Sequence, residues 1–403
     1  MAFTDVQGVK VWGTVEESAL KQAVRCRQVG NVAAVALMAD HHKGYSQPIG
    51  GVVAYRDAVS PSGVGYDIAC GNKAVRTDLK ASDVQRTIEP VMYEIFRQIS
   101  FGLGRKNPRP VDHELFDDPI WRDVPALGGL QKLAREQLGT VGSGNHYVDL
   151  FEEPATGDLW VGVHFGSRGF GHKTATGFLN LAHGRPFDGK GAGESMDQDP
   201  TVIPLRSDLG QAYLAAMKLA GRYAYAGRDY VIEQVLGILG ARPTFAVHNH
   251  HNFAWMEEHG GEQVTVIRKG ATPLAPGQLG FVGGSMGDIS VIIRGKDTPE
   301  ARFTLFSTIH GAGRIMSRTQ AAGKMNWKKG TREGGLISPQ QMREAVSGFG
   351  VTLRGGGTDE SPHVYRKLQA VLDAHRETLE VLHVLKPIGV AMAGIDEVDP
   401  YKD

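Results

Sequence analysis

Acidic residues, histidines and one cysteine follow short apolar runs along this chain of 403 residues. Asp67 and Cys70 stand three residues apart in GVGYDIACG, with glycines on both sides. A carboxylate and a thiolate that meet at a turn can hold a divalent cation, and a thiolate can bridge two cations. A buried cysteine without such a role is a small apolar core residue. The pair therefore predicts a metal site only if further donors join it.

Further donors occur in three segments, each at or beyond the end of an apolar run. These segments are VGSGNHYVDL with Asn145 and His146, WVGVHFGSRGFGHK with His164, Arg168 and His172, and FAVHNHHNFAW with His248, His250, His251 and Asn252. A side chain at the end of a strand can leave the sheet and enter a cleft. In the last segment, strand alternation sends His248 and His250 to one face and His251 to the other. We expect one ligand and two supporting histidines there.

One cysteine, one aspartate and three histidines are too many donors for a single tetrahedral structural ion. They suit two adjacent metals with open positions, the arrangement that binds the attacking and leaving oxygens in phosphoryl chemistry. Cysteine and histidine accept Zn²⁺, whereas phosphate chemistry favours Mn²⁺ or Mg²⁺. The donor types therefore leave the metal's identity open.

Two glycine-rich turns offer backbone N–H groups to an anion: GFVGGSMGDIS at 280–290 and STIHGAGRIMSR at 307–318. Neither has the spacing of a Walker A motif or of a Rossmann fingerprint. Both could be ordinary turns. His310 makes the second one more specific, because an imidazole facing a nucleotide phosphate can act as a nucleophile and form a phosphoramidate.

Helices and strands must bring these residues together. Helical periodicity predicts helices at 15–29, 81–99, 209–239 and 364–382. Apolar runs bounded by glycines predict strands at 31–40, 64–71, 146–152, 159–166, 244–250, 262–268 and 288–295. The chain has no fixed-period repeat. We therefore expect one α+β domain over residues 1–403, with mixed sheets, outer helices and a glycine-lined central cleft.

Composition excludes several classes of protein. The 44 basic and 44 acidic residues create no overall field for nucleic acid or an anionic membrane, so a polyanion must meet a local basic patch. Two cysteines cannot build a disulfide framework and fit a reducing compartment. Neither a signal peptide nor a membrane-spanning run is apparent. We expect a soluble cytoplasmic protein with no membrane partner.

Nine ordered motifs resemble the tRNA-splicing ligase family known as RtcB, over essentially the whole chain. They are ADHHKGYSQPIGG, VGYDIACG, GSGNHYVD, HFGSRGFGH, HHN, RKGAT, GGSMGD, HGAGRIMSR and DESPHVYR. The resemblance implies joining of RNA that ends in a 2′,3′-cyclic phosphate or 3′-phosphate to RNA with a 5′-hydroxyl. It also implies GTP and two Mn²⁺ ions as cofactors, and an activating partner of the archease type is a further expectation.

The resemblance also implies roles for individual residues. Asp67, Cys70 and His146 would bind one Mn²⁺, and Cys70, His164 and His251 the other. His310 would be guanylylated and Asp40 would orient it. The guanylate and its phosphates would lie among Asn145, Asp149, Asn252, Gly283, Gly284, Ser285, Met286, Ser290, Gly311, Ala312, Gly313, Arg168 and Arg314, and Arg318 would be a further phosphate contact.

This chain departs from the family pattern in three places. Asp149 stands where the family usually has a glutamate, which is one methylene longer and is expected to recognise guanine. Ala393-Gly394 replaces the Lys-Gly with which the family commonly ends. The family's AYK is here Val364, Tyr365 and Arg366. Guanine selectivity is therefore less firmly implied than metal binding.

Two other functions fit part of the sequence. A two-metal phosphohydrolase or a nucleotidyltransferase acting on cyclic phosphates or nucleotides would need the metal donors but no ligation. A catalytically inert RNA-binding protein could use KMNWKKGTR, from Lys324 to Arg332, where cations surround Trp327. A solvated charged loop is the simpler interpretation of that segment, and retention of all five metal donors argues against inertness.

Overall fold

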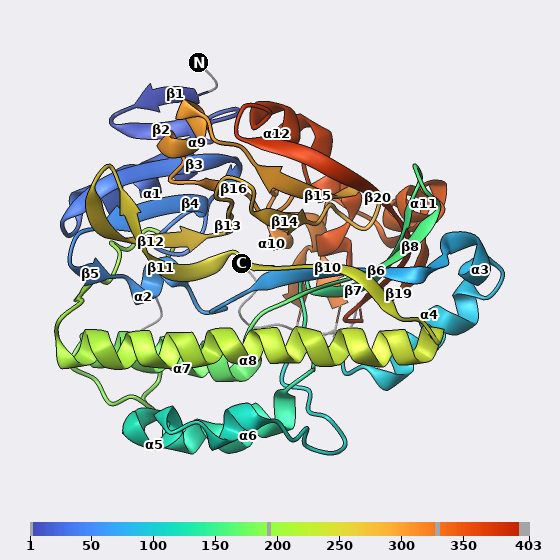
Figure 1. The fold of residues 1–403 in the computed structure, drawn as a ribbon, viewed down its shortest axis with the longest axis horizontal. Helices are drawn as coiled ribbons and strands as arrows, with labels where there is room; N and C mark the ends of the chain where they lie inside the picture. The colour runs from blue at the N-terminus through green and yellow to red at the C-terminus, as the bar shows by residue number, and fades with distance from the viewer. Residues whose placement is uncertain (1–2, 192–194, 327–330, 395–403) are drawn as a thin grey trace.

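Two large mixed sheets form the centre of the molecule (Figure 1). The structure is a computed structural model that describes residues 3–191, 195–326 and 331–394. The six-stranded sheet has the order β1 (Phe3–Val6), β2 (Val9–Trp12), β3 (Val32–His42), β4 (Ile49–Tyr55), β12 (Glu262–Lys269) and β11 (Asn252–His259). The eight-stranded sheet has the order β10 (Pro243–His250), β6 (Gly71–Lys80), β8 (Asp158–Phe165), β7 (Tyr147–Glu153), β20 (Leu379–Met392), β15 (Ser290–Gly295) and β14 (Leu279–Val282), with β19 (Thr352–Arg354) beside β20.

Helices cover the outer faces of these sheets, so the fold is α+β as predicted. The longest, α8 (Asp208–Leu239), runs along one side of the molecule next to α7 (Arg168–Ala182) (Figure 1). The other helices are α1 (Glu17–Gln28), α2 (Pro61–Val64), α3 (Ala81–Gln85), α4 (Ile88–Gln98), α5 (Ile120–Asp123), α6 (Gln131–Gln137), α9 (Pro299–Phe303), α10 (Arg318–Ala322), α11 (Pro339–Gly348) and α12 (Leu368–Ala374). The described residues also contain the 3₁₀ segments η1 (Glu114–Asp117), η2 (Pro125–Leu130), η3 (Thr358–Glu360) and η4 (Pro362–Val364).

Local sequence explains the limits of α8. The Ser207 hydroxyl accepts a hydrogen bond from the Gly210 amide at 3.1 Å and caps the first turn. Gly240 ends the helix with a φ of 64°, a conformation that glycine adopts without steric cost. Buried apolar residues recur along the helix and face β6, β8 and β10 of the eight-stranded sheet. The helix therefore supports the sheet that carries most of the site.

Three short strand pairs complete the described fold. They are β5 (Ala58–Val59) with β9 (Ile203–Pro204), β13 (Ala271–Pro273) with β16 (Ser307–Ile309), and β17 (Lys324–Asn326) with β18 (Thr331–Glu333). The pair β13 and β16 carries the chain into the 307–318 turn. The β17–β18 pair belongs to the segment interpreted as a solvated charged loop, with RNA contact as the alternative; its residues 327–330, including Trp327, lie outside the described residues.

Most predicted elements are present, but three predictions were wrong. The strand predicted at 64–71 is absent: residues 65–70 form a turn between α2 and β6, in which Ala69 adopts a φ of 59° and the Cys70 amide donates to the Asp67 carbonyl. The helix predicted at 81–99 is divided into α3 and α4. The helix predicted at 364–382 is α12 alone, and the chain joins β20 from Leu379 onward.

Tertiary contacts explain the early end of α12. The buried ring of His375 accepts a hydrogen bond from the Ala39 amide on β3 at 3.1 Å and stacks on Trp12. The Thr378 amide then donates to the His375 carbonyl at 2.8 Å and closes a turn. Pairing of the following residues with β15 therefore outweighs their local helical preference.

None of the helices in the three described ranges is both long enough and apolar enough to cross a membrane.

Candidate active site

Strand register brings the predicted metal donors to one edge of the eight-stranded sheet. His164 on β8 lies opposite Asn72 of β6 and Tyr147 of β7. Gly71 of β6 lies opposite His250 of β10. A Cβ atom on Gly71 would lie 2.2 Å from the Asn249 carbonyl oxygen, so glycine is required for these strands to approach. His164 is itself a predicted donor, and two other predicted donors, Cys70 and His251, stand next to Gly71 and His250 in the sequence.

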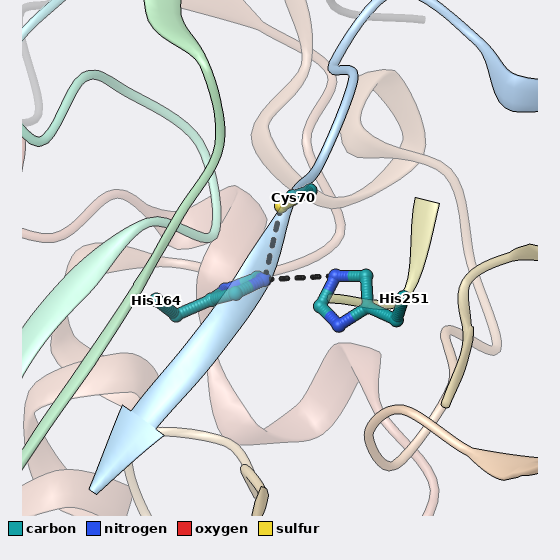
Figure 2. A group of neighbouring side chains, drawn as sticks. All are labelled: Cys70, His164 and His251. Carbon is teal, nitrogen blue, oxygen red and sulfur yellow. Dashed lines mark hydrogen bonds between the residues drawn. The ribbon is translucent and has the colours of Figure 1, made fainter. Parts of the chain in front are cut away.

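Five side chains converge at this edge in two groups that share Cys70. The first group is Cys70, His164 and His251, and the second is Asp67, Cys70 and His146. Within each group the candidate ligand atoms all lie within 4.8 Å of one another. Figure 2 shows the first group, in which His164 Nε2 lies 3.2 Å from Cys70 Sγ and 3.3 Å from His251 Nε2. The sequence predicted this set of five residues.

Hydrogen bonds on the far side of the rings turn two of the histidines toward the cluster. His164 Nδ1 lies 2.9 Å from the Asn145 carbonyl and His146 Nδ1 lies 2.9 Å from the Val141 carbonyl. An Nδ1–H that donates to a carbonyl leaves the Nε2 lone pair directed at the cluster, as in metal-binding histidines. Burial, followed by the neighbouring His146 ring, lowers the pKa of His164 to about 3, so its imidazole is neutral.

The second group combines a carboxylate with the shared thiol. His146 Nε2 lies 3.0 Å from Asp67 Oδ2 and 3.6 Å from Cys70 Sγ. Burial opposes ionisation of Asp67, but the neighbouring His146 ring and the charge of Arg168 hold its pKa well below the ordinary value. Burial and the Asp67 charge raise the pKa of the Cys70 thiol well above its ordinary value. Ionisation of this thiol therefore requires a compensating positive charge, which a coordinated cation provides.

His310 lies beside the first donor group and is held by Asp40 of β3. One oxygen, Asp40 Oδ2, accepts from His310 Nδ1 at 2.7 Å, from the His310 amide at 2.9 Å and from the Gly311 amide at 3.2 Å. Burial alone would raise the pKa of the fully buried Asp40, but His310 and these hydrogen bonds lower it. The His310 ring centroid lies 4.9 Å from that of His251. With Nδ1 bonded to Asp40, Nε2 is the ring nitrogen that could act as a nucleophile.

A cavity of about 300 Å³ extends from His310 along both glycine turns. It reaches Asp67, Cys70, His164 and His251 of the metal cluster. The other predicted residues on its wall are Asn145, Asp149, Asn252, Gly283, Gly284, Ser285, Met286, Gly311, Ala312, Gly313, Arg314 and Arg318. Its volume is at the lower end of the range for ligand pockets. Because the family resemblance predicts that a guanylate lies among these residues, we refer to it as the nucleotide cavity.

Two predicted contact residues lie outside the wall of the nucleotide cavity. Ser290 is behind the 280–290 turn, where its hydroxyl accepts from the Gly284 amide at 3.0 Å. Arg168 lies beyond the metal cluster, with Nη1 3.2 Å from His146 Nδ1. The sequence departure at Ala393-Gly394 is also away from this wall, whereas Val390 and Met392 are on it.

The two arginines of the second glycine turn, Arg314 and Arg318, are held in place by contacts with residues 359–365. Arg314 donates to the Asp359 carbonyl at 2.8 Å and to the Tyr365 hydroxyl at 3.0 Å. Arg318 pairs with Asp359 Oδ2 at 3.0 Å and with Glu360. The altered VYR sequence therefore keeps a contact to Arg314 through Tyr365.

Asp149 presents an unpaired polar atom to the nucleotide cavity. Its Oδ1 and the Tyr147 hydroxyl are buried and have no hydrogen-bond partner among the described residues. Burial raises the pKa of Asp149 well above its ordinary value. Both groups are buried polar atoms that a ligand could satisfy.

Sequence reasoning missed a buried cation that supports the cluster. Arg228 of α8 is fully buried and donates to the Ala69 carbonyl at 3.0 Å and the Phe165 carbonyl at 2.6 Å, next to Cys70 and His164. It also contacts His248 and His250, the two histidines predicted to have supporting roles. In the sequence, only the position of Arg228 on an apolar helix face could have indicated that its side chain is buried. Lys43, Lys269 and Tyr365, which also line the nucleotide cavity, were missed as site residues.

Comparison with known proteins identifies the family. The family model for tRNA-splicing ligase RtcB matches residues 22–124 and 127–393. The RNA-splicing ligase RtcB of Escherichia coli K12 is 30% identical over 429 residues, which cover 96% of this chain and 97% of that protein. The tRNA-splicing ligase RtcB of Thermococcus kodakarensis is 29% identical, with 92% of each protein covered. That of Archaeoglobus fulgidus is 30% identical over 95% of this chain. The chain therefore belongs to the RtcB family of tRNA-splicing ligases.

Proposed function

We propose that this protein is an RNA ligase that joins ends carrying a 2′,3′-cyclic phosphate or 3′-phosphate to ends carrying a 5′-hydroxyl, through guanylylated His310. The observation that carries the proposal is the contact of Asp40 Oδ2 with His310 Nδ1 at 2.7 Å. This contact directs Nε2 to a cavity that also borders the metal donors. A hydrolase would need the metal donors but would not need a histidine arranged in this way.

The donor set fits two divalent cations. Asp67, Cys70 and His146 would hold one, and Cys70, His164 and His251 would hold the other, so Cys70 belongs to both groups. Bound Mn²⁺ would act as a Lewis acid that stabilises negative charge on the phosphoryl oxygens. Family membership favours Mn²⁺, whereas the thiol and imidazole donors alone would also accept Zn²⁺.

The reaction would proceed in three transfers at phosphorus. His310 Nε2 attacks the α-phosphorus of GTP and pyrophosphate leaves with the bonding electrons. An oxygen of the RNA 3′-phosphate, opened by water if the end is cyclic, then displaces His310 and takes the GMP. Finally the 5′-hydroxyl attacks the RNA 3′-phosphorus, its proton is released to water, and GMP leaves. Asp40 holds the Nδ1 proton and offsets the positive charge on the ring during the first attack.

The wall of the nucleotide cavity supports guanylate as its ligand. Backbone N–H groups of both glycine turns and the guanidinium of Arg314 suit the phosphate. Asn145 and Asn252 also border the cavity, close to the metal donors. The unpaired Asp149 Oδ1 supplies a buried polar partner for the base. We propose Asp149 as the base-recognising residue and GTP as the nucleotide.

The test is formation of a covalent protein–GMP adduct. The protein is incubated with α-labelled GTP and Mn²⁺, with and without an archease-type activator, and the adduct is tested for lability in acid and stability in alkali. A labelled wild-type adduct that is lost in His310→Ala supports the proposal. A wild type that takes up no label, or a His310→Ala variant that takes up as much, overturns the ligase mechanism.

A further inference from the structure

Part of the wall of the nucleotide cavity is formed by the paired strands β7 and β20. Tyr147 lies opposite Met392, Asp149 lies opposite Val390, and all four residues line the cavity. Side chains two positions apart on a strand lie on the same face of the sheet. Tyr147 and Asp149 therefore share the face that borders the cavity.

The hydroxyl of Tyr147 is buried and has no hydrogen-bond partner among the described residues. The Tyr147 ring lies 5.4 Å from the ring of His164. Its hydroxyl lies against Gly283 of the first glycine turn, where an added Cβ atom would be 2.3 Å from the hydroxyl oxygen. Only 8% of the residue is exposed. A polar group that loses water without gaining a partner costs free energy, and a bound ligand can remove that cost.

Burial without a partner does not by itself identify a group that binds a ligand. The described part of the chain has another such hydroxyl on Tyr213 of α8, which is fully buried among apolar core residues away from the wall of the nucleotide cavity. Tyr147 differs because it borders the cavity and because Asp149, its neighbour on the same strand face, also presents an unpartnered oxygen, Oδ1. Two such atoms on one cavity wall indicate a shared ligand.

The two groups complement one edge of guanine. This edge presents the N–H groups at N1 and C2 as donors, next to O6 as an acceptor. The Asp149 oxygen can accept from an N–H group, and the Tyr147 hydroxyl can donate to O6. Three apolar residues of the same buried cluster as Tyr147 also line the cavity and suit the faces of a purine ring: Met286, Val390 and Met392.

We propose that the Tyr147 hydroxyl donates a hydrogen bond to O6 of the guanine base, next to the contact of Asp149 with the N–H groups of the same edge. This inference rests on the proposed function and adds a second base-recognising residue to it. Tyr147 makes and breaks no covalent bond. It therefore acts on the affinity for the nucleotide and on the choice of base.

The dissociation constant for GMP tests the contact without a covalent step, because GMP lacks the pyrophosphate leaving group. Kd values are measured by titration calorimetry on the full-length protein with Mn²⁺, for the wild type, Tyr147→Phe and Tyr213→Phe. Tyr147→Phe removes only the hydroxyl, and its Kd for GMP is expected to be about tenfold higher. Tyr213→Phe removes a buried hydroxyl outside the cavity wall and is expected to bind GMP as the wild type does.

Two analogues identify the atom of the base. Inosine monophosphate keeps O6 but lacks the amino group at C2, so Tyr147→Phe is expected to weaken its binding by the same factor as that of GMP. The monophosphate of 2-aminopurine riboside has hydrogen in place of O6, so its Kd is expected to differ by less than about twofold between the wild type and the variant. Equal weakening of the 2-aminopurine nucleotide would overturn the assignment to O6.

The stability of the free protein separates base recognition from a structural role. Loss of an unpartnered buried hydroxyl is expected to leave the Tm of free Tyr147→Phe unchanged or higher, whereas GMP raises the Tm of this variant less than that of the wild type. A lower Tm of the free variant with an unchanged Kd for GMP would overturn the inference, as would a wild type that binds no GMP. A wild type that binds GMP as described but forms no adduct from GTP refutes the ligase mechanism alone.

Discussion

At the scale of single residues, Asp40 determines which nitrogen of His310 faces the nucleotide cavity. One carboxylate oxygen accepts three N–H groups from residues 310 and 311, so the ring and the turn are fixed together. The glycine turn around His310 made it a nucleophile candidate, and the family resemblance named both His310 and Asp40. Its contact with Asp40, 270 residues earlier, depends on how β3 and β16 pack, which local sequence patterns do not encode.

The Asp40→Asn variant tests this role. An amide oxygen can accept the Nδ1–H but lacks the negative charge that offsets the imidazolium formed during attack on GTP. We expect the rate of His310 guanylylation to fall by about 100-fold or more. Mn²⁺ binding, measured by titration, should be unchanged, because Asp40 does not belong to either donor group. A wild-type rate of guanylylation in this variant would remove Asp40 from the mechanism.

Gly166 lies against Asp67, a predicted ligand of the second metal group, so a substitution of Gly166 tests that ligand. A Cβ atom at this position would lie 2.1 Å from Asp67 Oδ1, so Gly166→Ala must displace the carboxylate. We expect Mn²⁺ affinity to fall by about tenfold or more. Gly237→Ala is the matched control, because a Cβ atom there meets no atom within 4 Å. Equal metal titrations for the wild type and Gly166→Ala would argue that Asp67 is not a ligand.

At the scale of elements, the turn before β6 is held in place by α8. Arg228 binds the carbonyls of Ala69 and Phe165, and Ala69 has a φ of 59°, a conformation that a residue with a side chain seldom adopts. His248 and His250 both contact Arg228, which agrees with their expected position on one strand face, whereas His251 follows the end of β10 and belongs to the first donor group. The contact of these two histidines with Arg228 could not be predicted, because Arg228 comes from a helix whose rotation depends on packing.

The support from α8 predicts an effect on stability. Arg228→Met removes a buried cation and leaves the two carbonyls without their donor, which should lower the free energy of unfolding by about 3 kcal/mol or more. Arg222→Met on the same helix removes an ion pair to Asp118 with a half-exposed arginine and should cost less than about 1 kcal/mol. Thermal and denaturant unfolding of both variants gives the comparison. Equal stability losses would contradict the supporting role of Arg228.

Periodicity predicted an element correctly where residues close in the sequence determine its structure, and failed where long-range contacts determine it. The stretch 209–239 became α8 with almost the predicted limits because its apolar face and its caps agree. At 364–382 the local pattern is helical, but contacts of His375 with Ala39 and Trp12 turn the chain into β20. At 64–71 an alternating apolar pattern resembles a strand, yet the segment is the turn that presents Asp67 and Cys70. The misassigned segment is thus part of the site.

At the scale of the whole molecule, the site is formed by segments that lie far apart in the sequence. The edge of the eight-stranded sheet supplies the metal donors, and the β13–β16 pair and β3 supply His310 and Asp40. The chemical types of these residues are visible in the sequence. The order of the strands is not, because it depends on long-range pairing, so the way in which these segments meet could not be predicted.

The fate of a labelled RNA 3′-phosphate tests the account most directly. RNA with a labelled terminal 3′-phosphate is incubated with 5′-hydroxyl RNA, GTP and Mn²⁺, and the products are separated before and after phosphatase treatment. The account predicts that the label becomes resistant to phosphatase inside a longer RNA, that this requires GTP and His310, and that a chelator abolishes it. Release of the label as inorganic phosphate, with no longer RNA formed, would contradict ligation and favour a two-metal phosphohydrolase.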